Sequence, residues 1–245
     1  MLSVSFTDSV LRGHVDHTVE IVAATSSLVL DTAPGLKVSS AAVVDGEALA
    51  FAFGEADATF GVPLSITLPA SATVGSKVVI RIGFETSPSA GALQWLPPAQ
   101  TKGGKHPYLF SQAQAIHARS MLPCQDTPSN KFTYSAVVSV DAPLTALMSA
   151  QRTGSSAKGA VTEFTFNQPE PIPSYLLAIA VGELDSREIG PRSLVWSEPA
   201  LVDAGAHEFA LTEKFIAAGE AVCGPYPWGT YDVVRKHLCD DSARH

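Results

Sequence analysis

The sequence is poor in cysteine, in charged residues and in long apolar segments. Its three cysteines, Cys124, Cys223 and Cys239, include no C-x-x-C pair, so no disulfide framework is predicted. So few cysteines, in an odd number, favour a reducing compartment, and we expect a cytoplasmic protein. No apolar segment reaches the roughly 18 residues of a membrane-spanning helix, so no membrane partner is expected. The first residues lack the basic and apolar regions of a signal peptide.

Positive charge is also scarce. The 24 acidic residues outnumber the 16 lysines and arginines, and the net charge is −8. The basic residues are scattered, whereas phosphate binding requires a cationic patch, so nucleic acid is excluded as a partner. Apolar residues make up 46% of the 245 residues, which is enough to form a buried core in one or two domains.

Short segments of alternating apolar and polar residues fill most of the chain up to about residue 200. Val15, Val19 and Ile21 alternate with polar residues, a period of two that is typical of strands with one buried face. An earlier segment alternates in the same way at Val4 and Phe6, and Gly13 between the two segments suggests a turn. Further strands are expected at 27–32, 41–46, 49–53, 64–69, 77–86, 131–140, 145–150, 161–168, 174–184 and 193–198. The pattern predicts a mainly β fold, either a β-sandwich or a curved sheet. Residues 87–107 are expected to form a long loop and residues 152–160 a polar hairpin tip.

The pattern changes after residue 200. The segment LTEKFIAAGEAVCGPYPWG predicts a helix with Thr212 as its N-cap, and Gly224 followed by Pro225 marks its end. Apolar residues recur on one face of this helix. They are Phe215, Ile216, Gly219, Val222 and Cys223. Residues 231–234 then begin a strand with no evident continuation.

The stretch from Tyr108 to Tyr134 holds the densest set of polar groups. Gln112 and Gln114 flank Ala113, and in an extended chain their side chains point to the same side, about 6–7 Å apart. Two neutral amides offer both donors and acceptors, which suits binding of a peptide backbone. A polar face of an exposed strand would give the same pattern.

The histidines do not form a recognisable metal site. His14 and His17 are three residues apart in a predicted strand, so they point to opposite faces and are expected to be exposed. His207 and Glu208 begin an H-E-x-x-H pattern, but Leu211 occupies the second histidine position, and the zinc-protease motif fails.

Cys124 is a candidate nucleophile only if a histidine lies close to it in space. His106 and His117 are the histidines available within the same region. A buried structural cysteine is the favoured interpretation, because free cysteines are usually buried. Pro123, Asp126 and other turn residues nearby are expected to redirect the chain.

The segment ALQWLPPAQTKGGKHPYLFSQAQAIHARSMLPCQDTP resembles the N-terminal domain of leukotriene A(4) hydrolase and related zinc aminopeptidases of the aminopeptidase N superfamily. The similarity continues through YLLAIAVGELDSREIGPRSLVWSE to GPYPWGTYD. It implies a curved β-rich aminopeptidase domain followed by a thermolysin-like zinc domain. It also implies that Gln112, Ala113 and Gln114 hold the peptide substrate.

The family's zinc-binding segments are not found in these 245 residues. The resemblance therefore implies three parts: a β-rich domain (1–200), a truncated start of the zinc catalytic domain (201–234) and an unrelated tail (235–245). No cofactor is expected in this chain, although zinc is expected in a full-length relative. The chain is then an inactive N-terminal portion of such an enzyme. Its helix face of Phe215, Ile216 and Val222 would contact a second domain.

Two other hypotheses remain. The chain is alternatively a stand-alone, non-catalytic β-sandwich that binds a partner. The weakest alternative is an independent hydrolase that uses Cys124 or a histidine.

Overall fold

The chain folds mainly as β-strands, as predicted. The structure is a computed structural model, and it describes residues 1–235. The strands are β1 (Leu2–Ser5), β2 (Val10–Glu20), β3 (Ser27–Thr32), β4 (Lys37–Val43), β5 (Phe51–Phe53), β6 (Val62–Thr67), β7 (Lys77–Glu85), β8 (Leu93–Leu96), β9 (Tyr108–Ser111), β10 (Lys131–Asp141), β11 (Thr145–Met148), β12 (Gln151–Lys158), β13 (Val161–Pro173), β14 (Ile179–Gly182), β15 (Asp185–Gly190), β16 (Ser193–Ser197) and β17 (Tyr231–Val234). The helices are η1 (Pro98–Gln100), η2 (Ala118–Ser120), η3 (Ser174–Leu176), α1 (Val202–Glu208) and α2 (Thr212–Cys223).

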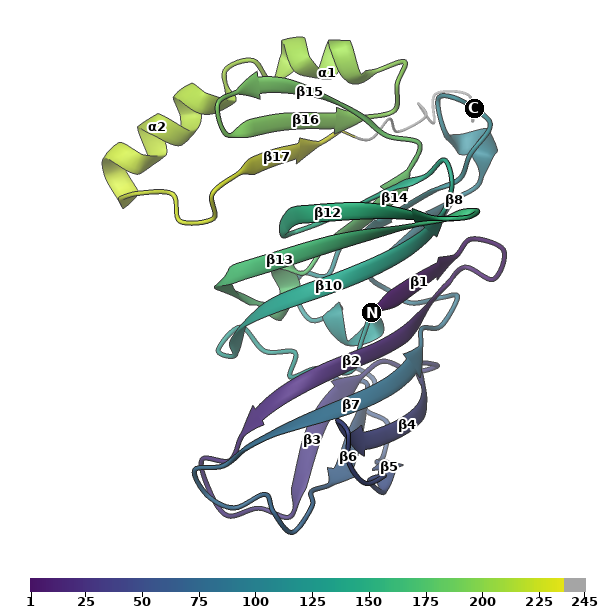
Figure 1. Ribbon diagram of the computed structural model, residues 1–245, viewed down its shortest axis with the longest axis vertical. Coiled ribbons are helices and arrows are strands. Elements are labelled where there is room, and N and C mark those ends of the chain that lie inside the picture. Colours follow the sequence, from purple (N-terminus) through teal and green to yellow (C-terminus); the bar gives the residue numbers. More distant parts are fainter. Residues whose placement is uncertain (236–245) are drawn as a thin grey trace.

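A seven-stranded sheet runs along the long axis of the molecule in the order β12-β13-β10-β1-β2-β7-β4 (Figure 1). The short strand β1 joins its two halves, since it pairs antiparallel with β2 and parallel with β10. Gly13, which suggested a turn, lies inside β2 opposite Leu2. A Cβ atom there would sit 2.0 Å from the carbonyl oxygen of Met1, so the glycine permits the close approach of β1.

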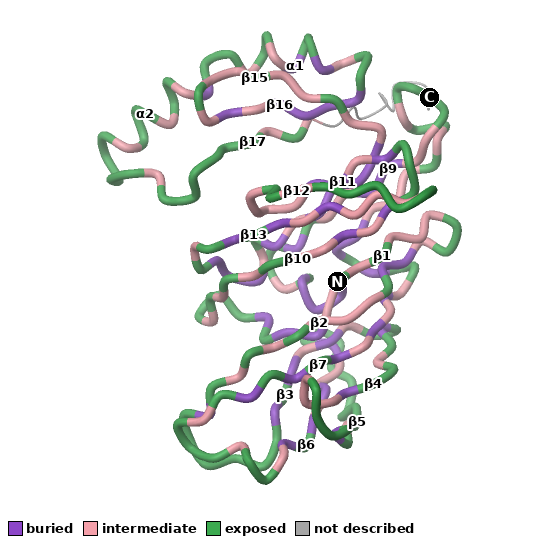
Figure 2. The backbone as a smooth tube through the Cα atoms, in the orientation of Figure 1, coloured by how far each residue is buried: buried purple, intermediate pink, exposed green. Residues whose placement is uncertain are grey.

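Smaller sheets cover the two halves of the long sheet. The four-stranded sheet β11-β14-β9-β8 packs against the half that contains β10 and β13. Leu109, Val138 and Val181 from these elements are fully buried between them. The three-stranded sheet β3-β6-β5 packs on the other half, where Leu64, Ile66 and Ile80 are fully buried. Figure 2 shows buried positions alternating along these strands, which is the pattern of the two apolar cores.

A fourth sheet, β15-β16-β17, lies at one end of the molecule with both α-helices beside it (Figure 1). Trp196 on β16 packs with Leu147 and Ala180 of the four-stranded sheet. The neighbouring Val195 is fully buried and contacts α1, where Gly205 allows the close approach. At β16 the sheet therefore contacts α1 on one face and the four-stranded sheet on the other.

The strand prediction holds best where apolar residues alternate regularly. Residues 27–32 form β3, as predicted. The polar segment 152–160, expected to be a hairpin tip, is instead largely β12, which pairs with β13 over seven register pairs. The expected loop 87–107 contains β8 and η1. The strand at 231–234 is not isolated, because it pairs parallel with β16.

The helix α2 forms as predicted, but most of its surface is exposed (Figure 2). Thr212 is its first residue and not its N-cap, which is Leu211, because the Thr212 hydroxyl donates to the carbonyl of Phe209. Of the predicted apolar face, Phe215 is 71% and Val222 85% exposed, and Ile216 is half-buried. Within the described residues, no helix has the length and hydropathy to cross a membrane.

Arg192 holds α2 to the turn between β15 and β16. Its guanidinium donates two hydrogen bonds of 2.8 and 2.7 Å to Glu220 and one of 3.1 Å to Glu213. The Arg192 hydrogen bonds lower the pKa of Glu220 to about 2, helped by the Tyr226 N–H. A carboxylate with a lowered pKa stabilises the folded state above its ordinary pKa of 4.5 and stops doing so as the pH falls toward 2.

We therefore expect α2 to separate from β15 and β16 between about pH 4.5 and pH 2, before the two sandwich cores unfold. Backbone NMR signals of α2 and of Tyr226, followed from pH 7 downward, measure this directly. In the control variant Arg192→Gln, α2 should already be loosened at pH 7 and its signals should lose this pH dependence. Unchanged wild-type α2 signals down to pH 2 would contradict the role of the ion pair.

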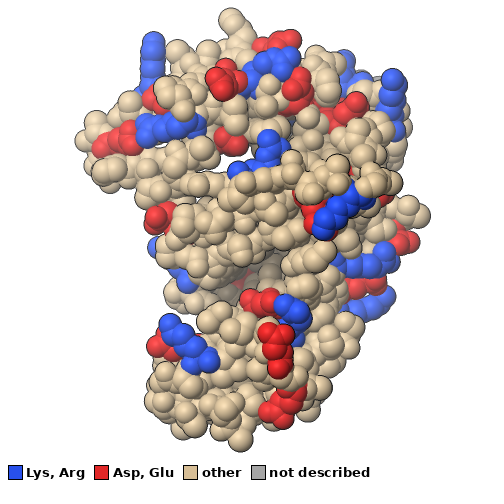
Figure 3. Space-filling model, in the orientation of Figure 1, with Lys and Arg blue, Asp and Glu red and all other residues tan. Residues whose placement is uncertain are grey.

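The charges on the surface are mixed in sign. On the face drawn in Figure 3, acidic and basic side chains are interspersed, with several in direct pairs. Examples are Arg81 with Asp16 at 2.6 Å and Arg12 with Glu85 at 2.6 Å. The prediction that the chain has no nucleic-acid partner rests on the net charge and stays a prediction.

Candidate functional site

The Gln112–Gln114 segment follows directly from the end of β9. Neither glutamine lies in a strand: Gln112 and Ala113 follow β9 without a regular secondary structure, and Gln114 lies in a turn. Gln112 and Gln114 are exposed, and Ala113 between them is 2% exposed within the core. The Gln112 Oε1 accepts a 3.3 Å hydrogen bond from the Gln114 N–H, and the Gln114–Ala115 peptide bond is cis. Two amide side chains are thus presented at the surface above a buried alanine.

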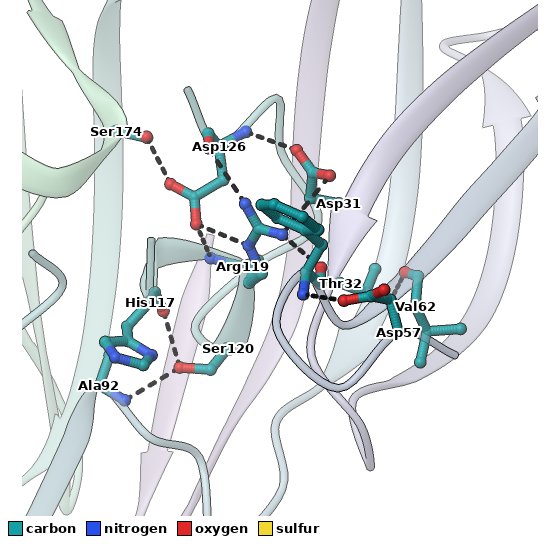
Figure 4. A network of polar contacts seen from close by, with 11 residues as sticks. Asp31, Thr32, Asp57, Val62, Ala92, His117, Arg119, Ser120, Asp126 and Ser174 are labelled. Carbon is teal, nitrogen blue, oxygen red and sulfur yellow. Dashed lines mark hydrogen bonds and ion pairs between the residues drawn. The ribbon is translucent and has the colours of Figure 1, made fainter. Parts of the chain in front are cut away.

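A chain of hydrogen bonds holds this segment in place. The Gln112 N–H donates to the Ala92 carbonyl at 2.8 Å, and the Ala92 N–H donates to Ser120 Oγ at 3.0 Å. The Ser120 hydroxyl donates to the His117 carbonyl at 2.7 Å, and the His117 N–H donates to the Ala113 carbonyl at 2.8 Å. Figure 4 shows the hydrogen bonds of this series that join Ala92, Ser120 and His117. Both ends of the turn are therefore fixed to the start of β8.

Arg119 and Asp126 form a buried ion pair beneath the turn (Figure 4). The Arg119 Nε donates to Asp126 Oδ2 at 3.0 Å, and the Arg119 backbone N–H donates to the same oxygen at 3.1 Å. The residues are 6% and 3% exposed. The Arg119 Nη2 also donates to the Asp126 carbonyl at 3.1 Å. A buried pair with this many hydrogen bonds satisfies most of its polar atoms.

The same pair connects separate parts of the fold. The Asp126 N–H donates to Asp31 at the end of β3, at 2.9 Å, and the Ser174 hydroxyl in η3 donates to Asp126 Oδ1 at 2.6 Å. Arg119 also donates to the carbonyl of Phe60, in the loop before β6. Figure 4 shows these groups converging on Arg119 from different elements. The turn that carries the glutamines is therefore tied to both sandwiches.

The sequence pointed to a simpler role for Asp126. It was expected to bond backbone amides in a turn, and it does accept from the Arg119 N–H. Its ion pair with Arg119 and its bond to Ser174, 48 residues away, were not predicted. The available signal was an internal arginine seven residues before an aspartate between two prolines.

Cys124 is not an activated nucleophile. It is 3% exposed, and burial raises the pKa of its thiol, with Asp126 and Asp31 adding to the effect. A nucleophilic cysteine requires the opposite, a lowered pKa. The Cys124 backbone instead pairs with Asp31, which is a structural role.

His17 and His117 differ in exposure, and neither activates Cys124. His17 was expected to be exposed, but its Nε2 lies 2.8 Å from the Pro123 carbonyl, and desolvation lowers its pKa. His117 is exposed and lies beside Gly91. A Cβ atom at position 91 would lie 3.4 Å from the His117 Nδ1. Neither histidine is bonded to Cys124.

The described residues do not fit a zinc ion. No group of three histidine, cysteine, aspartate or glutamate side chains in residues 1–235 could hold a metal. His207 and Glu208 lie in the last turn of α1, and Glu208 pairs with Arg235 at 3.0 Å. Arg235 was expected to begin an unrelated tail, yet its N–H also donates to the Trp196 carbonyl. The remainder of that predicted tail, 236–245, lies outside the described residues.

Known proteins resemble this chain over most of its length. Leukotriene A-4 hydrolase of Xenopus laevis is 46% identical over 239 residues, covering 91% of this chain and 39% of that protein. Leucine aminopeptidase 2 of Yarrowia lipolytica is 44% identical and covers 95% of this chain and 35% of that protein. The structure of native yeast LTA4 hydrolase superposes with a TM-score of 0.84 at 39% identity, over 95% of this chain and 36% of that one.

A more distant structure shares the fold alone. It is an M1 zinc metallopeptidase of Deinococcus radiodurans bound to a Tyr-Ser-Ala substrate, with a TM-score of 0.75 at 24% identity. The chain thus spans little more than a third of the length of the curated relatives it matches. The profile of the peptidase M1 N-terminal domain matches residues 1–176. On this evidence the chain belongs to the family of the peptidase M1 N-terminal domain, in the branch that contains LTA4 hydrolase and leucine aminopeptidase.

Proposed function

We propose that this chain is the N-terminal portion of a leukotriene A(4) hydrolase-like zinc aminopeptidase and contributes to binding of the peptide substrate. The observation that carries the proposal is the Gln112–Gln114 segment, two exposed amides around a buried Ala113 on a rigid support. Side-chain amides can both donate to and accept from a peptide backbone without adding charge. The zinc and its ligands are assigned to a part of the catalytic domain outside residues 1–235, since no group of side chains within those residues could hold a metal.

The division at about residue 200 forms part of the proposal. Residues 201–234 add α1, α2 and β17 to a sheet that begins with β15 and β16, and they leave Phe215 and Val222 almost fully exposed. Large apolar side chains exposed together mark an interaction surface. We assign the face of Phe215, Ile216 and Val222 to packing against the catalytic domain. A stand-alone binding module is expected to have a polar surface at this face instead.

A peptide titration tests the binding role. Adding the tripeptide Tyr-Ser-Ala to the 245-residue chain is expected to shift the side-chain NH₂ signals of Gln112 and Gln114 in an NMR spectrum. The binding should be weak, in the millimolar range, because only a few of the contacts of a complete site are present. The double variant Gln112→Leu/Gln114→Leu should remove the effect on the neighbouring backbone signals.

Gln125→Leu is the matched control, because Gln125 is an exposed glutamine of the same stretch that bonds Asn130 instead. It should bind the tripeptide as the unmodified chain does. The unmodified 245-residue chain is expected to retain no stoichiometric zinc after dialysis and to cleave no aminoacyl-anilide. Unmoved glutamine signals at saturating tripeptide would refute the binding role, and one retained equivalent of zinc would refute the assignment of the metal site elsewhere.

A further inference from the structure

A second, separate site is indicated by a cleft at the meeting point of three sheets. The cleft has a volume of about 410 Å³ and lies between the four-stranded sheet, β12 with β13, and β16 with β17. Figure 3 shows an opening between the end of the molecule that carries α2 and β17 and the sheet below it. Its wall is mainly apolar and aromatic and includes Phe110, Leu147, Met148, Phe166 and Trp196. Small-ligand sites have volumes of about 300–1,000 Å³, so a ligand of the size of one amino acid suits this one.

A cation without a polar partner lies at one side of the cleft. The guanidinium of Arg152 lies over the indole of Trp196, with the Cζ 5.0 Å from the ring centroid, and 5.9 Å from that of Phe164. In the described part of the chain, the Arg152 side chain forms neither a hydrogen bond nor an ion pair, although its positive charge acts on the nearby Asp232 carboxylate. Its planar set of N–H donors matches a carboxylate in two-pronged geometry. The arginine is thus held in position by aromatic rings while its donors stay available.

A carboxylate lies at the edge of the same indole. Asp232 Oδ2 accepts the Trp196 Nε1–H at 3.1 Å. Desolvation raises the pKa of Asp232, which shows that its surroundings do not fully compensate the negative charge. An ammonium group placed beside it would supply that compensation. The Leu194 backbone also bonds the Asp232 carboxylate, and the positive charge of Arg152 acts on it; both lower the pKa but do not cancel the effect of desolvation.

We propose that this cleft binds a free hydrophobic α-amino acid, with its carboxylate on Arg152, its ammonium on Asp232 and its side chain against the aromatic wall. Both charges lie against one indole ring, so a single small zwitterion reaches the two of them. An apolar wall with few convergent polar groups is the usual composition of small-ligand sites. The cleft does not include Gln112 or Gln114, so the inference does not rest on the proposed function.

The test is a titration of the 245-residue chain with L-leucine and with L-phenylalanine. The indole Nε1–H NMR signal of Trp196 reports on the cleft, and calorimetry measures the affinity. Three related compounds each lack one feature: N-acetyl-L-leucine has no ammonium, L-leucinamide has no carboxylate, and glycine has no side chain. Each is expected to bind at least tenfold more weakly than L-leucine, since each leaves one part of the cleft unpaired.

Variants of the two charges complete the test. Arg152→Met keeps a side chain that can lie on the indole, and Asp232→Asn keeps an acceptor for the Trp196 Nε1–H. Both are expected to weaken L-leucine binding at least tenfold without unfolding the chain, because β12 and β17 are edge strands of their sheets and asparagine still accepts the Trp196 bond. Lys158→Met, which removes a charge from the same strand β12 away from the cleft, should bind normally. Equal binding of L-leucine and N-acetyl-L-leucine, or a Trp196 signal that does not move at millimolar L-leucine, would overturn the proposal.

The outcome is separable from that of the proposed function. A peptide that shifts Gln112 and Gln114 but leaves Trp196 unmoved supports the substrate-binding role and refutes the amino-acid cleft. If L-leucine shifts the Trp196 signal while Tyr-Ser-Ala leaves the glutamine signals unmoved, the amino-acid cleft is supported and the substrate-binding role is refuted.

Discussion

Arg119→Met is expected to lower the free energy of unfolding by about 3–5 kcal/mol, because it leaves the Asp126 carboxylate buried without its counter-ion. Asp126 is 3% exposed, so water cannot replace the lost guanidinium. Methionine fills part of the space, so the loss arises mainly from charge and hydrogen bonding. Urea unfolding followed by circular dichroism measures it, with an unchanged m value if the variant still unfolds in one step.

The matched control is Arg187→Met. Arg187 also forms two ion pairs, with Asp185 at 2.8 Å and Asp203 at 2.7 Å, but its side chain is 40% exposed. Exposed pairs contribute about 0–1 kcal/mol, so the control should change stability little. The double variant Arg119→Met/Asp126→Leu should cost less than the sum of its two single variants, since removing both charges leaves no unpaired ion. Equal losses for the Arg119 and Arg187 variants would refute the account of Arg119.

The outcome bears on the Gln112–Gln114 segment as well as on stability. Arg119 lies five residues after Gln114. Its side chain forms an ion pair with Asp31 and donates to the Phe60 carbonyl, and both of these residues belong to one sandwich. Ser174, bonded to Asp126, belongs to the other. A variant that stays folded but loosens this connection should therefore broaden the Gln112 and Gln114 signals before those of the sandwich cores.

Much of the fold could be predicted from residue patterns because most strands bury one face. Leu28, Leu30 and Thr32 alternate with less buried neighbours in β3, and residues 77–85 do the same in β7. The alternation follows from strand geometry, so it can be read without knowing the partner strand. The order of strands in each sheet could not be predicted in this way, since β1 pairs with β10, more than 120 residues later.

The missed elements have sequences without that alternation. β12 reads QRTGSSAK and is an edge strand with no buried residue, so its composition resembles a turn. β15 reads DSREIG and is likewise stabilised by pairing with β16. Gly13 is the reverse case: a turn residue by composition that lies within a strand because β1 passes close to it. In each case a distant backbone decides the local structure.

The candidate site was predictable in part for a related reason. Gln112, Ala113 and Gln114 were singled out from the sequence by the spacing of the two amides and by the family resemblance, and both glutamines are exposed. The cleft beside Trp196 was not, because its lining comes from seven strands: β9, β11, β12, β13, β14, β16 and β17. Arg152 and Asp232 are 80 residues apart and are brought together only by the tertiary fold.

Phe166→Ala is expected to lower the free energy of unfolding by about 3–5 kcal/mol, whereas Phe215→Ala should change it by less than about 0.5 kcal/mol. Phe166 on β13 is 2% exposed and packs within the core formed with the four-stranded sheet, so alanine leaves a cavity. Phe215 on α2 is 71% exposed and makes little contact to lose. Urea unfolding of both variants beside the unmodified chain provides the comparison.

The same pair of variants separates folding from partner binding. The unmodified chain is expected to bind the dye 1-anilinonaphthalene-8-sulfonate on the face of Phe215, Ile216 and Val222, and Phe215→Ala should reduce that binding. If Phe215→Ala destabilises the chain as much as Phe166→Ala does, α2 is already covered, by a second copy of the chain or by another surface. If it removes dye binding and leaves stability unchanged, the phenylalanine contributes to an interface that these residues do not themselves complete. The exposed phenylalanine would then be explained by the domain it is proposed to contact, and not by the fold described for residues 1–235.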